Sequence, residues 1–207
     1  MEKRRLEETT ATDCRGTNIS TQSSSIYFQV NKLQNSSVDR PKKKVRDSSL
    51  VTSYLMMPQD ANPHGNVYGG TIMRDVDGVA AAVAERHCRT NTVTASIDRM
   101  DFIKPVYVGN LLTIKASINC VGETSMEIGV RIEAENLATG QVVHTGSCYL
   151  TYVALDRDGK PTVVPDVELE TEDERRRYSE AQERRKIRLM ERTQSIINSK
   201  HLREISQ

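Results

Sequence analysis

The chain has 207 residues, which is enough for one sizeable domain with extensions. Its formal net charge of +1 gives no general reason to expect a polyanionic partner, and 4% aromatic residues with no Trp disfavour a base-stacking surface. The apolar runs are far shorter than a membrane span, and the charged N-terminus lacks the apolar core of a secretory signal. We therefore expect a cytoplasmic protein with no membrane span and no nucleic-acid partner.

Residues 1–49 are expected to form a disordered extension, because they contain a Ser/Thr-rich stretch and a basic, Pro-containing stretch. The run "PKKKVR" has the composition of a nuclear-import or phosphate-binding patch, but short basic runs are more often solvated linkers. Within the extension, "SSIYFQVNKL" has the composition of a short strand.

Residues 50–166 carry the regular patterns of one folded domain. Segment 70–88 predicts a helix, and its alanines make that helix slim and strongly helix-prone. A slim apolar helix is one that a sheet can wrap closely. The face expected to be apolar, with residues at three- and four-residue steps, consists of Met73, Val76, Ala80, Val83 and His87.

Four segments predict strands: 92–106, which ends near Pro105, then 111–119, 126–136 and 141–155. The last is apolar on both faces in parts, as in a central or interface strand. Short Gly-containing turns between the segments favour an antiparallel meander and an α+β fold. The apolar row expected in the core is Leu112, Ile114, Ala116, Ile118, Met126, Ile128, Val130, Ile132 and Ala134. The polar row opposite it is Glu127, Arg131, Glu133 and Glu135.

Residues 167–207 predict a charged helical tail. Thr171 and Glu174 have the spacing of a capping box, and Glu180 and Arg184 form an i,i+4 pair. Because its apolar stripe is thin, we expect this helix to pack lightly on the domain with a solvated face. The alternative is a basic contact surface for a phosphate ligand.

The cysteines and histidines have mainly structural interpretations. Four cysteines form neither a CxxC pair nor a zinc spacing, so we expect reduced thiols, no metal site and no cofactor. His64 has the surroundings of a turn residue, whereas His87 and His144 lie in the predicted helix and a predicted strand. The motifs GxSxG and GxxxxGK do not occur, which disfavours a serine nucleophile elbow and a P-loop.

The segment "NPHGNVYGGTIMRDVDG", residues 62–78, combines a turn, two glycines and a helix start. A helix N-terminus exposes unpaired N–H groups, and Gly69 and Gly70 would let a carbonyl oxygen approach them. Asp77, two turns into the helix, could act as a general base or nucleophile, and Asn66 could orient water or the carbonyl. From chemistry alone, an ordinary helix entry and an exposed acid are the more common interpretation.

Three segments resemble one enzyme family: "PQDANPHGNVYGGTIMRDVDGVAAAVAERHC", "NTVTASIDRMDFIKPVYVGNLL" and "GETSMEIGVRIEAENLATG". They are similar, from about residue 55 to 165, to the cytosolic acyl-CoA thioesterases of the hotdog fold, which include brain-type acyl-CoA hydrolases and bacterial relatives. The resemblance implies a single hotdog domain at residues 50–166, in which an antiparallel sheet wraps a long central helix. It also implies hydrolysis of acyl-CoA to CoA and a fatty acid, in a homodimer at minimum and a homohexamer made of three dimers.

The resemblance also assigns residues. It implies that Asn66 and Asp77 are catalytic, with Asp77 contributed by the facing subunit, and that the backbone near Gly69 and Gly70 binds the oxyanion. The family often has a second acid after the helix carboxylate, whereas Gly78 stands here.

Three further residues, Lys104, Thr124 and Ser125, are expected to contact CoA, since their segments resemble the family's segments near the bound CoA.

Two rival functions share this fold. One is an acyl-CoA-binding sensor without hydrolysis, and the other is a hydratase or dehydratase in which His64 pairs with Asp77. Thiol release and enoyl-CoA hydration assays separate the three.

Overall fold

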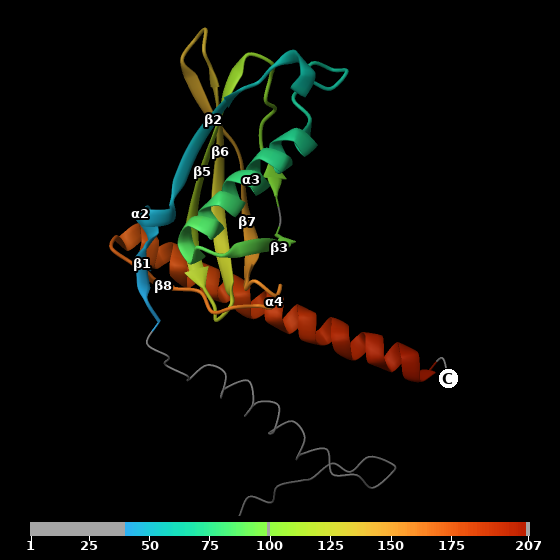
Figure 1. Ribbon diagram of the computed structural model, residues 1–207. Coiled ribbons are helices and arrows are strands. Elements are labelled where there is room, and N and C mark those ends of the chain that lie inside the picture. The colour runs from blue at the N-terminus through green and yellow to red at the C-terminus, as the bar shows by residue number, and fades with distance from the viewer. Residues whose placement is uncertain (1–39, 99, 206–207) are drawn as a thin grey trace, which may run out of the picture. The chain divides into compact units, whose positions relative to one another are not determined.

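The computed structural model describes residues 40–98 and 100–205, with side chains up to residue 194. An antiparallel sheet lies against the central helix α3 (Gly69–Cys88), which crosses one of its faces (Figure 1). The strand order is β2 (Leu50–Leu55), β5 (Asn110–Val121), β6 (Ser125–Asn136), β7 (Gln141–Leu155) and β3 (Asn91–Ile97), and β4 (Asp101–Phe102) also pairs with β7. The expected α+β architecture, a long helix wrapped by an antiparallel sheet, is confirmed.

The core lies between α3 and the inner face of the sheet. The expected apolar row on β5 and β6 is buried, with each of its nine side chains at most 4% exposed. On α3, Val76, Ala80 and Val83 are buried as expected, but Met73 is 38% exposed and Ile72 takes the buried position. The buried face is therefore rotated by one residue at the helix start, because Ile72 rather than Met73 is in line with Val76 and Val79.

The strands depart from a simple meander in two places. Only β5, β6 and β7 follow one another as neighbours, since α3 intervenes between β2 and β3 and sends them to opposite ends of the strand order. The strand expected at 92–106 is divided into β3 and β4, both of which pair with β7. The prediction of one continuous strand was therefore wrong, because β3 ends at Ile97 and β4 begins at Asp101.

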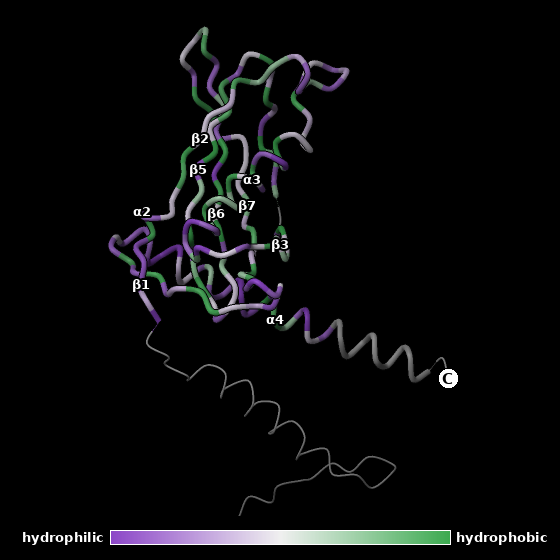
Figure 2. Tube along the Cα trace, in the orientation of Figure 1, coloured by the Kyte–Doolittle hydropathy of each residue, from purple (hydrophilic) through white to green (hydrophobic). Residues whose placement is uncertain are grey.

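The basic run near residue 42 belongs to the folded unit. Lys42–Lys44 form β1, which pairs in parallel with β8 (Asp166–Glu168), and helix α2 (Val45–Ser48) follows directly. Val45 and Ser48 are buried, so the expectation of a solvated linker was wrong here. Figure 2 shows β1 as a hydrophilic segment. The strand expected within 24–33, and the rest of the extension up to residue 39, lie outside the described residues.

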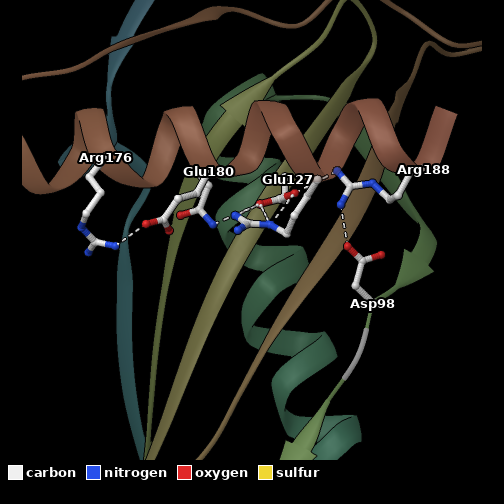
Figure 3. Close-up of polar contacts among 7 residues, drawn as sticks. Asp98, Glu127, Arg176, Glu180 and Arg188 are labelled. Carbon is white, nitrogen blue, oxygen red and sulfur yellow. Dashed lines mark hydrogen bonds and ion pairs between the residues drawn. The ribbon is translucent and has the colours of Figure 1, made fainter. Parts of the chain in front are cut away.

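The C-terminal helix α4 (Glu172–Ile205) starts with the expected capping box. Glu174 N–H donates to Thr171 Oγ1 at 3.2 Å, and Thr171 N–H donates to the Glu174 carboxylate at 3.0 Å. The helix does not pack lightly, because Ala181 is fully buried and Arg184 and Arg188 bind the buried Glu127 of β6 (Figure 3). Glu127, which belongs to the expected polar row, thus faces helix α4 rather than water. Glu180 pairs with Arg176, and Arg184 is engaged by Glu127 instead of forming the expected i,i+4 pair.

Candidate active site

The turn before α3 is held by an asparagine side chain. Asn62 Oδ1 accepts hydrogen bonds from the backbone N–H groups of His64, at 2.9 Å, and Asn66, at 3.2 Å. The Asn62 N–H donates to the Asn66 carbonyl at 2.6 Å, and Gly65 supplies the left-handed backbone with φ of 83°. The predicted Asn66 is half-buried, and a β-bridge fixes its backbone to Tyr107.

The start of α3 has the properties of an oxyanion-binding site. Tyr68 occupies the cap position without a side-chain cap bond, and no acid lies in the first turn. The first hydrogen bond within the helix runs from Ile72 N–H to Tyr68 O. The N–H groups of Gly69, Gly70 and Thr71 come before it and so have no acceptor within the helix. A Cβ at Gly69 would lie 3.3 Å from the Phe102 ring, whereas one at Gly70 would meet nothing within 4 Å. Gly70 therefore leaves the positive helix end open to a ligand.

Two hydroxyl groups fix the carboxylate of Asp77. Its Oδ1 accepts hydrogen bonds from Tyr152 OH at 2.7 Å and Thr94 Oγ1 at 2.9 Å. Tyr152 is 1% exposed, and burial raises the pKa of its phenol, with the Asp77 carboxylate raising it further. The phenol thus remains a proton donor at neutral pH. Asp77 itself is half-buried, so its carboxylate is oriented but still accessible.

Within one chain, Asp77 and the helix start lie apart. Asp77 stands eight residues after Gly69, which corresponds to about 12 Å along the helix axis. A carbonyl bound at the N–H groups of Gly69 and Gly70 would therefore be out of reach of the same chain's carboxylate.

The expected CoA contacts lie in two separate loops. Thr124 and Ser125 are half-buried at the β5–β6 turn, where the Thr124 carbonyl accepts from Ala154 N–H at 2.9 Å and the Ser125 carbonyl accepts from Gly122 N–H at 2.7 Å. Lys104 is exposed in the loop after β4. Within residues 40–98 and 100–205, no ion pair or hydrogen bond joins Lys104 to that turn.

The histidines have structural positions. His87 is buried and its Nε2 donates to the Pro165 carbonyl at 3.0 Å. His144 lies within hydrogen-bond distance of Ser147 Oγ, at 2.9 Å. His64 is exposed in the turn, and the Asp77 hydrogen bonds go to Thr94 and Tyr152 rather than to an imidazole. The His64–Asp77 pair that a hydratase would need is not formed in this chain.

Thr94 and Tyr152 were not predicted from the sequence. Each lies in a segment correctly expected to be extended, but a single strand carries no sign of which distant carboxylate its hydroxyl will meet.

The described part of the chain has no group of three or more His, Cys, Asp or Glu side chains that could hold a metal ion. Its cysteines, Cys88, Cys120 and Cys148, are free, and none of its helices is long and apolar enough to cross a membrane.

Comparison with known proteins assigns the family. The Thioesterase superfamily model matches residues 64–141. Protein VdlD of Helicobacter pylori is 44% identical over 141 residues, which are 68% of this chain and 80% of that relative. The chain belongs to the thioesterase superfamily. Solved structures agree with this assignment over most of the folded unit.

A hexameric acyl-CoA thioesterase, solved in its apo form, is similar to this superfamily member with a TM-score of 0.71 and 38% identity. The match covers 73% of this chain and 97% of that one. An acyl-CoA hydrolase from Staphylococcus aureus, solved with butyryl-CoA, CoA and CoA disulfide, has a TM-score of 0.69 and 38% identity, covering 75% and 97%. That hydrolase has also been solved with an asparagine, an aspartate and a threonine, at its positions 28, 43 and 60, each replaced by alanine. The hotdog fold expected for this thioesterase superfamily member is confirmed.

Proposed function

We propose that the protein hydrolyses acyl-CoA thioesters to free CoA and a fatty acid. The observation that carries the proposal is the Asp77 carboxylate, which two hydroxyls hold on a helix whose uncapped, glycine-rich start is open to an oxyanion. The names and ligands of the related acyl-CoA hydrolases support the substrate class.

In this mechanism, the thioester carbonyl oxygen accepts hydrogen bonds from the N–H groups near Gly69 and Gly70. Asp77 accepts a proton from water as the water oxygen bonds to the carbonyl carbon, and the tetrahedral intermediate then expels the CoA thiolate. Neutral hydroxyl donors suit this role, because they orient the carboxylate without cancelling its charge. Single-turnover hydrolysis in ¹⁸O-labelled water tests the base role in one direction: label in the Asp77 carboxylate would require an anhydride that water opens at the Asp77 carboxyl carbon, which general-base catalysis does not form.

The amide of the site is better assigned to Asn62 than to Asn66. The three substituted positions of the Staphylococcus aureus hydrolase, 28, 43 and 60, correspond with one constant offset of 34 to Asn62, Asp77 and Thr94, and the residue type agrees each time. In the structure, the Asn62 oxygen is used within the turn, which leaves its amino group free to donate to a carbonyl or a water. Thiol release by Asn66→Ala tests the predicted role of Asn66.

The proposed active unit is a homodimer, assembled further into a homohexamer. The separation between Gly69 and Asp77 in one chain favours a site completed by the facing subunit. β3 is the last strand in the strand order, and its Thr94 binds Asp77, so Asp77 lies near that end of the sheet. Large apolar side chains are exposed around the helix start and along β3, as expected for a surface that a second copy covers. They are Tyr68, Met73, Val93, Ile97, Phe102, Ile103, Tyr107 and Val108. Light scattering on a size-exclusion column should give the mass of six chains.

The remaining assignments belong to the same proposal. Residues 50–166 form the catalytic hotdog domain and 167–207 a helical tail. Of the predicted extension 1–49, residues 40–49 join the folded unit through β1 and α2, and 1–39 remain as the extension. The protein acts in the cytoplasm. Lys104, Thr124 and Ser125 contact CoA, with Lys104 as a point charge for a phosphate. Lys104→Gln should then raise KM for acyl-CoA more than it lowers kcat.

The test is release of free thiol from acyl-CoAs of short and long chain length. Wild-type protein should turn over at least one of them, and Asn62→Ala and Asp77→Asn should lose most activity. Asp75→Asn is a matched control, because Asp75 lies on the same helix and pairs with its neighbour Arg74. Tight binding of acyl-CoA with no thiol release would refute hydrolysis and favour a sensor.

A further inference from the structure

A hollow of about 780 Å³ lies between α4 and the β3, β6 and β7 strands. Arg185, Arg188 and Arg192 line it from α4, and Ser96, Thr151 and Ser125 line it from the sheet and its β5–β6 turn. All six are polar, and Ser125 alone among them is also one of the CoA contacts proposed above.

The hollow and the Asp77 carboxylate lie on opposite faces of β7. Successive side chains of a strand point to opposite faces, and Tyr152 points to α3, where its hydroxyl meets Asp77. Thr151, the preceding residue, therefore points to the face that α4 covers. The thickness of the sheet separates a ligand in the hollow from the carboxylate of the same chain.

Two of the three arginines have free hydrogen-bonding capacity. Arg188 is engaged by Asp98 and by Glu127 at 2.8 Å. In the described part of the chain, Arg185 and Arg192 form no ion pair, and Glu191 is the remaining acid that lines the hollow. The Arg185 guanidinium lies over Gly122, because a Cβ there would be 2.5 Å from its Nη2 and 2.9 Å from Ser125 Oγ. A guanidinium and a hydroxyl therefore approach the same point.

A separate observation indicates a missing partner on the opposite wall. Thr151 Oγ1 is buried and has no hydrogen-bond partner among the described residues. A buried hydroxyl without a partner is costly and uncommon in a native protein. An oxygen-rich ligand in the hollow would accept this hydroxyl proton and the Arg185 N–H groups together.

We propose that this hollow binds the phosphoryl group of a phosphorylated ligand. Arg185 supplies a planar fork that matches phosphate oxygens, Ser125 and Thr151 add hydroxyl donors, and Arg192 adds positive charge at the opening. The same chemistry has two sources: the phosphates of CoA within the assembled enzyme, or a separate phosphorylated metabolite. The binding site itself does not depend on the proposed hydrolysis, and only its use for CoA rests on that function.

The first experiment is calorimetric titration of the full chain with inorganic pyrophosphate. Wild-type protein should bind it, and Arg185→Gln should bind at least about tenfold more weakly, the loss of a charge-assisted contact. Thr151→Val, which keeps the side-chain shape, should weaken binding by a smaller factor without unfolding the protein. Arg176→Gln is the control, because Arg176 lies on the same helix and pairs with Asp173 and Glu180 at the surface.

The second experiment identifies the source of the phosphate. If CoA occupies the hollow, Arg185→Gln raises KM for acyl-CoA about tenfold and leaves KM for the matching acyl-pantetheine, which has no phosphate, unchanged. If a separate metabolite occupies it, both KM values stay constant while pyrophosphate binding is lost. Wild-type protein that does not bind pyrophosphate, or equal binding by wild type and Arg185→Gln, overturns the proposal. The titration decides this even for a protein without hydrolase activity.

Discussion

Two carboxylates on opposite sides of the sheet are held in contrasting ways. Asp77 is half-buried and accepts hydrogen bonds from the neutral hydroxyls of Thr94 and Tyr152. Glu127 is 2% exposed and is bound by Arg184 at 2.7 Å, Arg188 at 2.8 Å and Asn119 at 3.2 Å (Figure 3). The first carboxylate is oriented and keeps its charge available, whereas the second is compensated by two cations and serves the attachment of α4.

The physical reason for the difference is the cost of burying charge. A carboxylate as deeply buried as Glu127 requires opposite charges and full hydrogen bonding, which its three partners supply. Arg184 is itself supported, since its guanidinium lies 3.7 Å from the centre of the Tyr149 ring. Because Arg184, Arg188 and Asn119 occupy the Glu127 oxygens, anchoring α4 and orienting a water molecule need two separate carboxylates.

The largest expected effect is on catalysis at Asp77. Asp77→Asn should lower kcat for acyl-CoA hydrolysis by about 10²–10⁴-fold, the range for loss of a general base. The melting temperature should change little, because the amide oxygen still accepts the hydroxyl hydrogen bonds. A thiol-release assay with thermal denaturation checks both, and retention of wild-type kcat would contradict the assigned role.

The next effect is on stability at Glu127. Glu127→Ala should lower the free energy of unfolding by about 3 kcal/mol, since it leaves the partly buried Arg184 without its counter-charge and Arg188 with Asp98 alone. Urea denaturation measures the change. The control is Glu133→Ala on the same strand, whose partners Lys115 and Arg131 are exposed, with an expected cost below about 1 kcal/mol. Equal costs for the two variants would show that the buried network adds nothing.

A smaller effect is expected from one hydroxyl. Tyr152→Phe removes one of the two donors to Asp77 and should lower kcat by about tenfold, with a small change in KM. Tyr149→Phe, on the same strand, keeps the ring beside Arg184 and should leave kcat unchanged. If both variants behave alike, hydrogen bonding by Tyr152 does not orient the carboxylate.

The smallest effect concerns pH. Burial lowers the pKa of His87. The hydrogen bond to Pro165 raises this pKa, and the charge of Lys43 lowers it, so the net shift is downward. The unfolded chain therefore takes up a proton near pH 6.5 that the folded chain resists, so the free energy of unfolding falls as pH drops below about 6.5. His87→Gln should lose less stability over pH 6.5 to 5 than wild type. Parallel stability curves for the two proteins would contradict this assignment.

The sequence predicts the elements of this fold better than their partners. Alternation on β5 and β6 identifies the core row, and the capping box marks the start of α4. Alternation also places Glu127 on the polar face, but its burial depends on arginines 57 and 61 residues away. The hydroxyls at Asp77 come from positions 17 and 75 residues away, so local pattern cannot reveal them.

The parallel pairing of β1 and β8 has a consequence for how the chain folds. The two strands join residues 124 positions apart, on either side of α3 and the whole antiparallel sheet. Closing so long a loop is slow, and during synthesis it must wait until residue 168 has left the ribosome. The β5–β6–β7 hairpins, whose contacts are local, can form earlier. We therefore expect β1 and α2 to join a sheet that has already assembled.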